Sequence, residues 1–286
     1  MEQLQKLEQL VSDNKIPIGQ WSKSAIEWLT TNLGWLFNAI SKFLKIVIDG
    51  SSDGLLVVPP LILLVLLVAL AHVIQRNWKI TVFVAVGLVL ILNLGLWKEM
   101  VETLVLVIYA TVASLAVGVP IGILAARRRA VWQFLSPVLD MMQTLPTFVY
   151  LIPMLALFRL GVVPGIFATV VFAIPAPIRL TYLGISQVPV SLVEAGEAFG
   201  STRWQLLFKV KLPAALPTII AGITQCIMLC LSMVVIASMV GAPGLGVPVL
   251  RALATNNIAQ GAEAGLAIVI LAIALDRVTK PRAAAR

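Results

Sequence analysis

The polar side chains best suited to chemistry in an apolar environment lie between residues 140 and 150. Asp140 is followed one turn later by Gln143 and Thr144, and then by Tyr150. A carboxyl group within an apolar segment indicates a functional site by default. Asp140 could act as an acid or base or line a pathway, and it could equally have a structural role, by pairing with an arginine or capping a helix. Gln143 and Thr144 are better candidates for the lining of a pathway.

Two further polar residues, Thr224 and Gln225, interrupt a later apolar segment. They could face Gln143 and Thr144 across a pathway, and they could equally form hydrogen bonds between helices.

The other reactive residues form no catalytic or metal-binding pattern. Cys226 and Cys230 have no histidine or carboxylate beside them, which favours packing over metal binding or a disulfide. His72, the single histidine, is expected to be hydrogen-bonded at an interface. The glycine-rich stretch 241–246 lacks the Lys and Ser/Thr of a Walker motif, so we expect an external turn that re-enters or caps a mouth. We therefore expect no catalytic residue, metal or cofactor on this chain.

The composition places these residues in a membrane protein. Of the 286 residues, 60% are hydrophobic and only 12% are charged, and the mean hydropathy is +1.00. Soluble chains are about 45–50% apolar and about 25% charged. The sequence therefore predicts an all-α membrane protein with several spanning helices. The net charge of +8 then reports topology and gives no reason to expect nucleic acid, because Lys and Arg accumulate in cytosolic loops.

Seven apolar segments are long enough to cross a hydrocarbon core about 30 Å thick. The fourth and fifth contain prolines, which bend helices and free carbonyls that must face protein or a water-lined cavity. With the loop 191–213 in the cytosol, thirteen Lys and Arg from residue 56 onward lie inside and three outside, which places the N-terminus outside and the C-terminus inside. The segments cover residues 56–74, 80–97, 101–126, 134–158, 163–183, 217–240 and 262–278.

The first fifty residues differ from the rest. Residues 1–20 are polar, are expected to be loose, and do not resemble a signal peptide. Over residues 21–50, charges interrupt the apolar pattern too often for a spanning helix, and tryptophan recurs every seven residues. We expect an amphipathic helix in the external membrane interface, the alternative being an ordinary packing helix of a soluble cap. Its apolar stripe comprises Leu29, Leu33, Leu36, Ile40, Phe43 and Val47.

The longest polar interruption of the apolar part, residues 191–213, is interpreted as two short helices. Ser191 with Glu194, and Thr202 with Gln205, have the spacing of capping boxes. Gly200 stands where the first helix needs a left-handed residue, and we expect Pro213 to end the second. Small and aromatic side chains favour docking into another protein; they are Ala195, Gly196, Ala198, Phe199, Trp204 and Phe208.

The same stretch resembles the EAA loop of ABC-importer permeases. At the spacing of that family it carries Glu194, Ala195, Gly196, Gly200, Val210, Leu212 and Pro213. Two positions depart mildly from the pattern: Gly196 replaces the third small residue and Val210 replaces the usual isoleucine. Segments 140–153, 174–189 and 231–246 extend the resemblance over residues 55–280, where the chain is similar to permeases of the glycine betaine, proline and choline type.

The resemblance implies the type I permease fold over residues 56–280 and a set of partners. These are a second copy of the chain in a homodimer, two cytosolic ATPase subunits that hold ATP and Mg, an external substrate-binding protein, and membrane lipid. The permease would move glycine betaine, choline, proline betaine or a similar compatible solute across the bacterial cytoplasmic membrane by alternating access. Coupling to the ATPases would fall to Glu194, Ala195, Gly196, Ala198, Phe199, Gly200, Trp204, Leu212 and Pro213.

Two other classes of function are weighed against this one. An intramembrane enzyme that used Asp140 as an acid or base would need a second catalytic group at the same depth, and the sequence offers none. A non-transporting membrane scaffold would not require a loop with this spacing. An ATPase partner and substrate-stimulated hydrolysis would support the importer alone.

The distribution of positive residues makes a prediction about topology. A reporter fused after Arg129 should lie in the cytosol and one fused after Trp97 outside, because the third apolar segment separates the two positions. Fusions to alkaline phosphatase, which is active outside, and to a fluorescent protein, which is active inside, measure this. Both fusions reporting the same side would contradict the seven-segment arrangement.

Overall fold

The structure is a computed structural model that describes residues 17–280. Within that range the chain forms helices and turns, with no strand, as the all-α prediction requires. The polar segment predicted over residues 1–20 lies almost wholly outside the described residues. In chain order the elements are α2 (Ile18–Val57), α3 (Pro60–Gln75), α4 (Trp78–Asn93), α5 (Trp97–Arg127), α6 (Arg129–Thr144), η1 (Thr147–Tyr150), α7 (Leu151–Phe158), α8 (Val162–Ala173), α9 (Pro175–Ser186), α10 (Val190–Ala198), α11 (Arg203–Gln205), η2 (Leu206–Lys211), α12 (Leu212–Ala237), η3 (Ser238–Val240), α13 (Gly246–Ala254) and α14 (Ile258–Thr279).

Among residues 17–280, four helical runs are long and apolar enough to cross a membrane: Trp97–Arg127, Val162–Ser186, Arg203–Val240 and Ile258–Thr279. Two bent pairs raise the number to six if each pair is one span, namely α2 with α3, bent by 106°, and α6 with η1–α7, bent by 109°. The remaining predicted segment corresponds to α4, whose 16 residues are fewer than the about 20 that a spanning helix usually needs. The count of seven therefore stays a prediction.

Prolines are expected to bend the fourth and fifth segments, and in the structure only the fourth is broken. The fourth segment does break at Leu145 and Pro146, both of which have extended backbone angles, while Pro153 lies inside α7. The fifth segment runs from α8 into α9 through Ile174, which keeps helical angles, so Pro175 and Pro177 do not interrupt it. Each proline lacks only its own N–H, and the N–H of Ile178 again donates to the carbonyl of Ile174 at 3.4 Å, so helical hydrogen bonding resumes directly after them.

The residues of the apolar stripe predicted for α2 differ in exposure. Leu36 and Phe43 are exposed, whereas Leu29, Leu33, Ile40 and Val47 are half-buried, as are Phe37 and Leu44 beside the stripe. Phe37 packs edge-on against Phe158 of α7, with ring centroids 5.4 Å apart, so this side of α2 contacts the bundle. The stripe stays a prediction. The three tryptophans of α2 are exposed, and their place in a membrane interface remains a prediction.

Helix α9 packs against α5 and α12 at glycine contacts. A methyl group on Gly122 of α5 would lie 2.7 Å from the backbone oxygen of Ile178, and one on Gly222 of α12 would lie 2.9 Å from the Cβ of Leu180. Small residues at interfaces are what lets helices associate in lipid, where the hydrophobic effect does not drive them together. Cys226 and Cys230 are buried free thiols in the main core, as the packing prediction requires.

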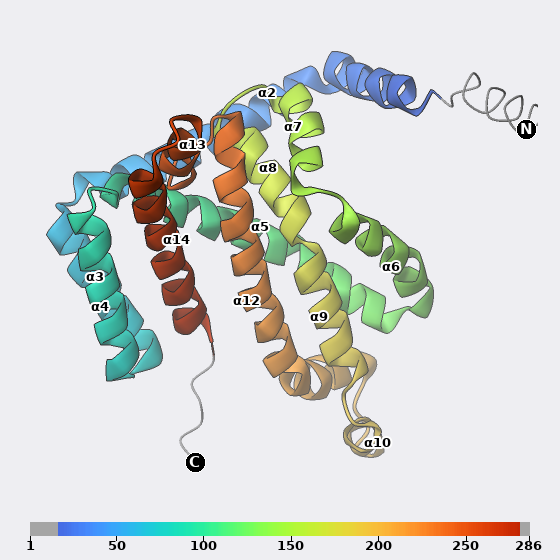
Figure 1. The fold of residues 1–286 in the computed structure, drawn as a ribbon. Coiled ribbons are helices and arrows are strands. Elements are labelled where there is room, and N and C mark those ends of the chain that lie inside the picture. Colours follow the sequence, from blue (N-terminus) through green and yellow to red (C-terminus); the bar gives the residue numbers. More distant parts are fainter. Residues whose placement is uncertain (1–16, 281–286) are drawn as a thin grey trace, which may run out of the picture.

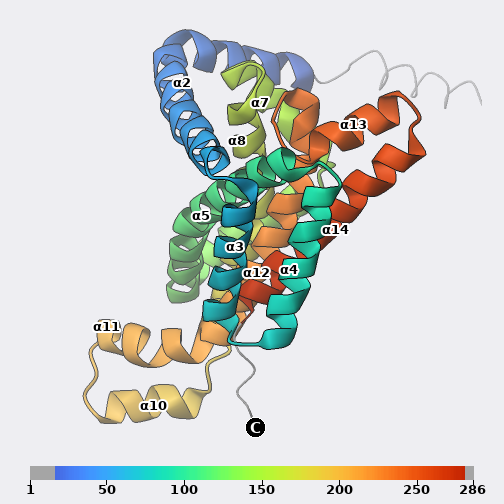
Figure 2. The ribbon, with the colours of Figure 1, turned by 90° about the vertical axis from the view of Figure 1, so that its left-hand side faces the viewer.

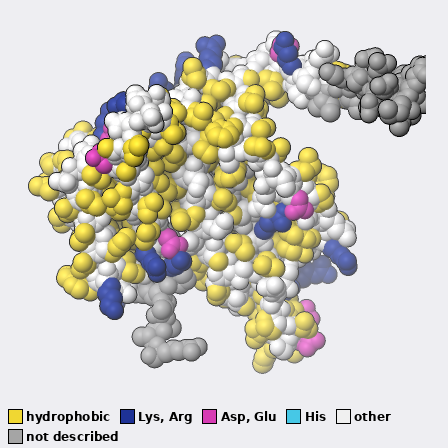
Figure 3. All heavy atoms as spheres, in the orientation of Figure 1, with side chains coloured by type: hydrophobic (Ala, Val, Ile, Leu, Met, Phe, Trp, Pro, Cys, Tyr) yellow, Lys and Arg dark blue, Asp and Glu magenta, His cyan; other side chains and the backbone are white. Residues whose placement is uncertain are grey.

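The two ends of the bundle carry different elements. Figures 1 and 2 show α10, α11, the turn between α3 and α4 and the last turns of α5 and α14 at one end, with α2, α7 and α13 at the other. Hydrophobic side chains cover much of the face between the ends (Figure 3). Near the turn between α3 and α4, His72 of α3 hydrogen-bonds through Nδ1 to Oγ1 of Thr81 of α4 at 2.9 Å, consistent with the hydrogen-bonded histidine predicted there.

The glycine contacts of α9 make a prediction about stability. Gly122→Ala should lower the Tm of the detergent-purified protein by several degrees, because overpacking against a fixed backbone oxygen costs about 1–3 kcal/mol. Gly265→Ala in α14 is the matched control, since nothing lies within 4 Å of the added methyl group. Differential scanning fluorimetry measures both. Equal Tm values for the two variants would contradict the close contact of α5 and α9.

Candidate functional site

The loop predicted over residues 191–213 projects from one end of the bundle as two helices (Figure 2). Its first helix, α10, begins at Val190 after Pro189, which takes the N-cap position. The capping box predicted for Ser191 and Glu194 is therefore wrong: no side chain caps α10, because the proline starts the helix before Ser191. The Glu194 side chain is exposed.

The turn between the two helices is fixed by hydrogen bonds at both sides. Gly200 has a φ of +75°, the predicted left-handed conformation. Its N–H donates to the carbonyl of Glu197 at 2.9 Å, and the N–H of Ser201 donates to the carbonyl of Gly196 at 3.1 Å. This pair of bonds is a Schellman motif. The second predicted capping box is confirmed: Gln205 Oε1 accepts from the N–H of Thr202 at 2.8 Å, and Thr202 Oγ1 accepts from the N–H of Gln205 at 3.3 Å.

Pro213 does not end the second helix, which corrects the prediction. The chain passes from α11 through the six-residue π-helix η2 directly into α12, so that residues Arg203–Val240 form one run of 38 residues. Pro213 is the second residue of α12. The wider turns of the preceding π-helix accommodate the proline ring and its missing N–H without breaking the run. The loop is therefore a direct extension of α12.

The two helices of the loop pack together and leave an outer surface without a partner in the described chain. A methyl group on Gly196 would lie 2.8 Å from Cδ1 of Leu206, so the small residue lets α10 rest on η2. Ala195, Ala198 and Glu194 are exposed on α10, and Phe199 at the turn is 91% exposed. Together with the exposed Val190 and Leu192 of α10, these side chains form an apolar surface of the kind that marks a protein interaction site.

A second group of predicted residues meets at a cavity of about 360 Å³ between helices. Gln143 of α6 and Gln225 of α12 both line it, together with Arg179 of α9 and apolar residues that include Phe172. The structure thus brings together one residue from each predicted polar pair.

The remaining predicted pathway residues do not line that cavity. The hydroxyl of Thr224 donates to the carbonyl of Ile220 at 3.2 Å, and that of Thr144 donates to the carbonyl of Met141 at 3.0 Å. The buried Tyr150 donates to the carbonyl of Met142. Each of these three side chains satisfies its hydroxyl on nearby backbone.

Asp140 forms an ion pair with Arg179, at 2.5 Å between Oδ1 and Nη2. Of the roles considered for Asp140, this geometry matches pairing with an arginine. Its side chain is 62% exposed, so the pair contributes at most about 1 kcal/mol. Among the residues that line the cavity there is no carboxylate or histidine, so an enzyme that used Asp140 has no second acid or base there.

Sequence reasoning counted Arg179 only toward topology and missed it as a site residue. The available signal was its position in a spanning segment, since an arginine within such a segment is costly and indicates function or pairing. Its side chain is 29% exposed and its Nε has no partner among the described residues.

The glycine-rich turn 241–246 connects the ends of two helices on the side of the bundle opposite the loop. The N–H of Leu245 donates to Oγ1 of Thr103 in α5 at 2.7 Å, and the N–H of Gly161 donates to the carbonyl of Val240 at 2.9 Å. The turn therefore fixes the end of α12 against α5 and α8, and α13 follows it.

Comparison with known proteins bears on both sites. Residues 118–279 match the family described as binding-protein-dependent transport system inner membrane component. The chain is 48% identical over 266 residues to the glycine betaine transport system permease protein OpuAB of Bacillus subtilis (strain 168), covering 93% of this chain and 94% of that one. It is 41% identical over 270 residues to the glycine betaine/proline betaine transport system permease protein ProW of Escherichia coli (strain K12), covering 93% and 75%.

The solved structures show a related fold. An inward-facing conformation of the MetNI methionine ABC transporter superposes with a TM-score of 0.59 at 22% sequence identity, covering 65% of this chain and 92% of that one. The fold and the family match agree with the resemblance carried by residues 194–213. The chain therefore belongs to the binding-protein-dependent transport system inner membrane components, as a permease subunit of an ABC importer in the inner membrane.

Proposed function

We propose that this chain imports glycine betaine or a similar compatible solute, with ATP hydrolysis on separate subunits. The observation that carries the choice of solute is the similarity over 93% of the chain to permeases named for glycine betaine. Choline and proline betaine belong to the same chemical class, a quaternary ammonium group. The chain itself acts as a pathway and a mechanical link, not as an enzyme.

The continuous helix from the loop into the bundle supplies that link. The ATPase subunits dock on the outer surface of α10, and ATP binding moves it. The Gly196–Leu206 contact passes the movement to η2, which continues into α12. Gln225 lies thirteen residues after Leu212, about 20 Å along the helix axis, so movement of the loop reaches the cavity without an intervening joint. Alternation between inward-facing and outward-facing states follows.

The cavity has the chemistry of a weak, transient solute site. Two amide side chains, Gln143 and Gln225, offer N–H donors to a carboxylate, and Phe172 offers an aromatic surface. The charge of Arg179 is partly balanced by Asp140. A quaternary ammonium group has no N–H to donate and no lone pair to accept a hydrogen bond, so strong selection requires an aromatic cage. That selection belongs to the external substrate-binding protein, and this cavity needs only to let the solute pass.

We also propose the other subunits of the importer and the orientation of this chain in the membrane. The permease works as a homodimer with two cytosolic ATPase subunits, which hold ATP and Mg, and an external binding protein. The α3–α4 turn, the end of α5 and the end of α14 lie at the loop end of the bundle (Figures 1 and 2). Their Lys and Arg residues are Arg76, Lys79, Arg127, Arg277 and Lys280. Positive residues mark the cytosolic side, so the N-terminus lies outside and the C-terminus inside.

The docking surface makes a prediction about coupling. Glu194→Ala and Gly200→Val should leave the protein inserted, weaken association with the ATPase by at least about thirtyfold, and abolish solute-stimulated hydrolysis. The loss of a desolvated charge pair costs about 2–5 kcal/mol, and a side chain at φ +75° strains the turn. Because no side chain caps α10, Glu194→Gln should fail like Glu194→Ala.

Co-purification of the ATPase and hydrolysis in proteoliposomes measure these effects. Ser191→Ala is the control, since Ser191 is exposed on the same helix and caps nothing. Normal association and transport in both the Glu194 and Gly200 variants would show that α10 is not the coupling element.

The cavity makes a separate prediction about transport. Gln225→Leu should lower uptake of radiolabelled glycine betaine about tenfold in proteoliposomes, because an amide hydrogen bond to a charged group contributes about 1.5–3 kcal/mol. Association with the ATPase should not change, as the residue lies far from the loop. The adjacent Thr224→Val is the control, since its hydroxyl already bonds to its own helix. Full uptake by the Gln225 variant would exclude this cavity from the pathway.

A further inference from the structure

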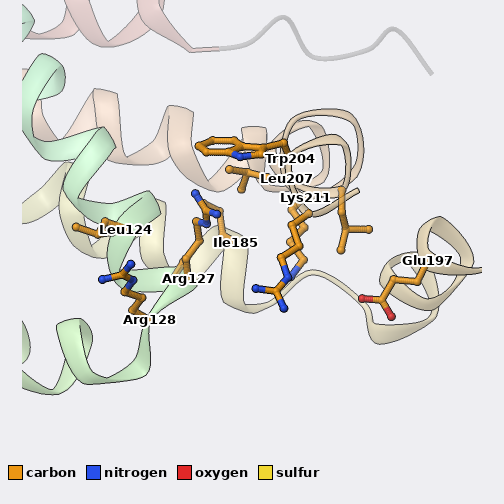
Figure 4. Close-up of a pocket in the computed structure, with 11 residues that line it drawn as sticks. Leu124, Arg127, Arg128, Ile185, Glu197, Trp204, Leu207 and Lys211 are labelled. Carbon is orange, nitrogen blue, oxygen red and sulfur yellow. The ribbon is translucent and has the colours of Figure 1, made fainter. Parts of the chain in front are cut away.

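A larger cavity, of about 730 Å³, lies between the inner side of the loop and the end of the bundle (Figure 4). The last turn of α5, the end of α9, and α11 with η2 form its walls. Its charged lining residues are Arg127, Arg128, Arg203, Lys211 and Glu197. Glu197 is its one lining residue from α10, and Glu194 and Phe199, on which the proposed docking surface rests, do not line it.

The residues that line this cavity carry more positive than negative charge. Four cations and one carboxylate give its lining a net charge of +3 (4 − 1). None of the four cations is in an ion pair with a carboxylate anywhere in residues 17–280. Like charges brought together raise the free energy of the folded state, and a bound anion lowers it. The excess positive charge of the lining residues therefore favours the binding of a negatively charged ligand.

One of the cations is already held in position. The guanidinium carbon of Arg127 lies 4.4 Å from the centroid of the Trp204 ring, and that ring stacks on Phe208 at 5.7 Å with 11° between the planes. Figure 4 shows Arg127 reaching from the end of α5 toward Trp204 on the loop. A guanidinium fixed against an aromatic face keeps its N–H groups available in the fork that suits phosphate oxygens.

The rest of the lining is apolar and lies where a spanning helix ends. Leu124 is in the last turn of the long apolar helix α5, and Ile185 and Leu207 are buried beside the cavity. Trp204 of α11 and Phe208 of η2 are exposed, and the same continuous helical run carries Arg203, Lys209 and Lys211. Exposed aromatics combined with lysine and arginine on one helix are typical of a membrane interface.

We propose that this cavity binds the phosphate headgroup of an anionic phospholipid. The cations contact the phosphate, and the acyl chains run along the apolar surface of α5 that begins at Leu124. A soluble phosphate shares the headgroup chemistry, and an acidic segment of a partner protein is a different occupant. The apolar border at the end of a spanning helix favours the lipid, because neither of the others has a tail to bury there.

The test measures lipid binding to the purified full chain in detergent by native mass spectrometry and by the rise in Tm. The probes are dioleoyl phosphatidylglycerol, dioleoyl phosphatidylcholine, and glycerol phosphate as the soluble headgroup. We expect saturable binding of phosphatidylglycerol, at least about tenfold tighter than that of phosphatidylcholine. The double variant Arg127→Gln/Arg203→Gln should weaken phosphatidylglycerol binding by about tenfold or more.

A charge-matched control separates the cavity from general electrostatics. Arg129→Gln/Lys209→Gln removes two cations from the same segments, but neither residue lines the cavity, so binding should stay within about twofold of wild type. Equal losses in the two double variants would overturn the proposal. So would glycerol phosphate binding as tightly as the lipid, which would make the ligand a soluble anion.

Two further outcomes also decide the question. If the double variant fails to insert, Lys211→Gln removes one lining cation and should still weaken phosphatidylglycerol binding by about threefold; no change would contradict the proposal. If the double variant keeps full lipid binding but loses association with the ATPase, the cavity is a protein contact and the lipid assignment is wrong.

Discussion

The structure depends on α9 lying against α5 and α12 at separations that only glycine permits. In lipid the hydrophobic effect does not draw helices together, so packing density and close backbone approach must do so. Gly122 lies against the backbone oxygen of Ile178, and Gly222 lies against Leu180. Because these contacts flank Arg179 on both sides in sequence, they also fix where its guanidinium meets Asp140 and the Gln225 cavity.

The same contacts decide which parts of the molecule move together. The loop continues into α12 without a break, and α12 is packed on α9 at Gly222, so a displacement of the loop carries both helices. The π-helix η2 is the exception to regular hydrogen bonding along this run. Such segments are often found at functional sites, where the wider turn can absorb a change of register.

Local patterns predicted the fold class and most segments, because apolar length and turn chemistry depend on neighbouring residues alone. The Thr202 capping box and the left-handed Gly200 are examples. Prediction failed where a feature depended on context: Pro189 started α10 early, and a π-helix carried the chain through Pro213. The Asp140–Arg179 pair joins residues 39 positions apart, and no local pattern specifies such a contact.

The two sides of the loop differ in charge, which fits the two partners proposed for them. The outer side exposes Glu194 and Phe199, while the inner side faces the end of α5 with Arg203, Lys211 and one carboxylate, Glu197. Arg127 of α5 and Arg203 of the loop both line the inner cavity, so the proposed headgroup would bridge them. A ligand shifts an equilibrium only as far as it binds one state better than the other. If the loop moves away from α5 during transport, a bound headgroup therefore favours the state in which the two arginines stay close.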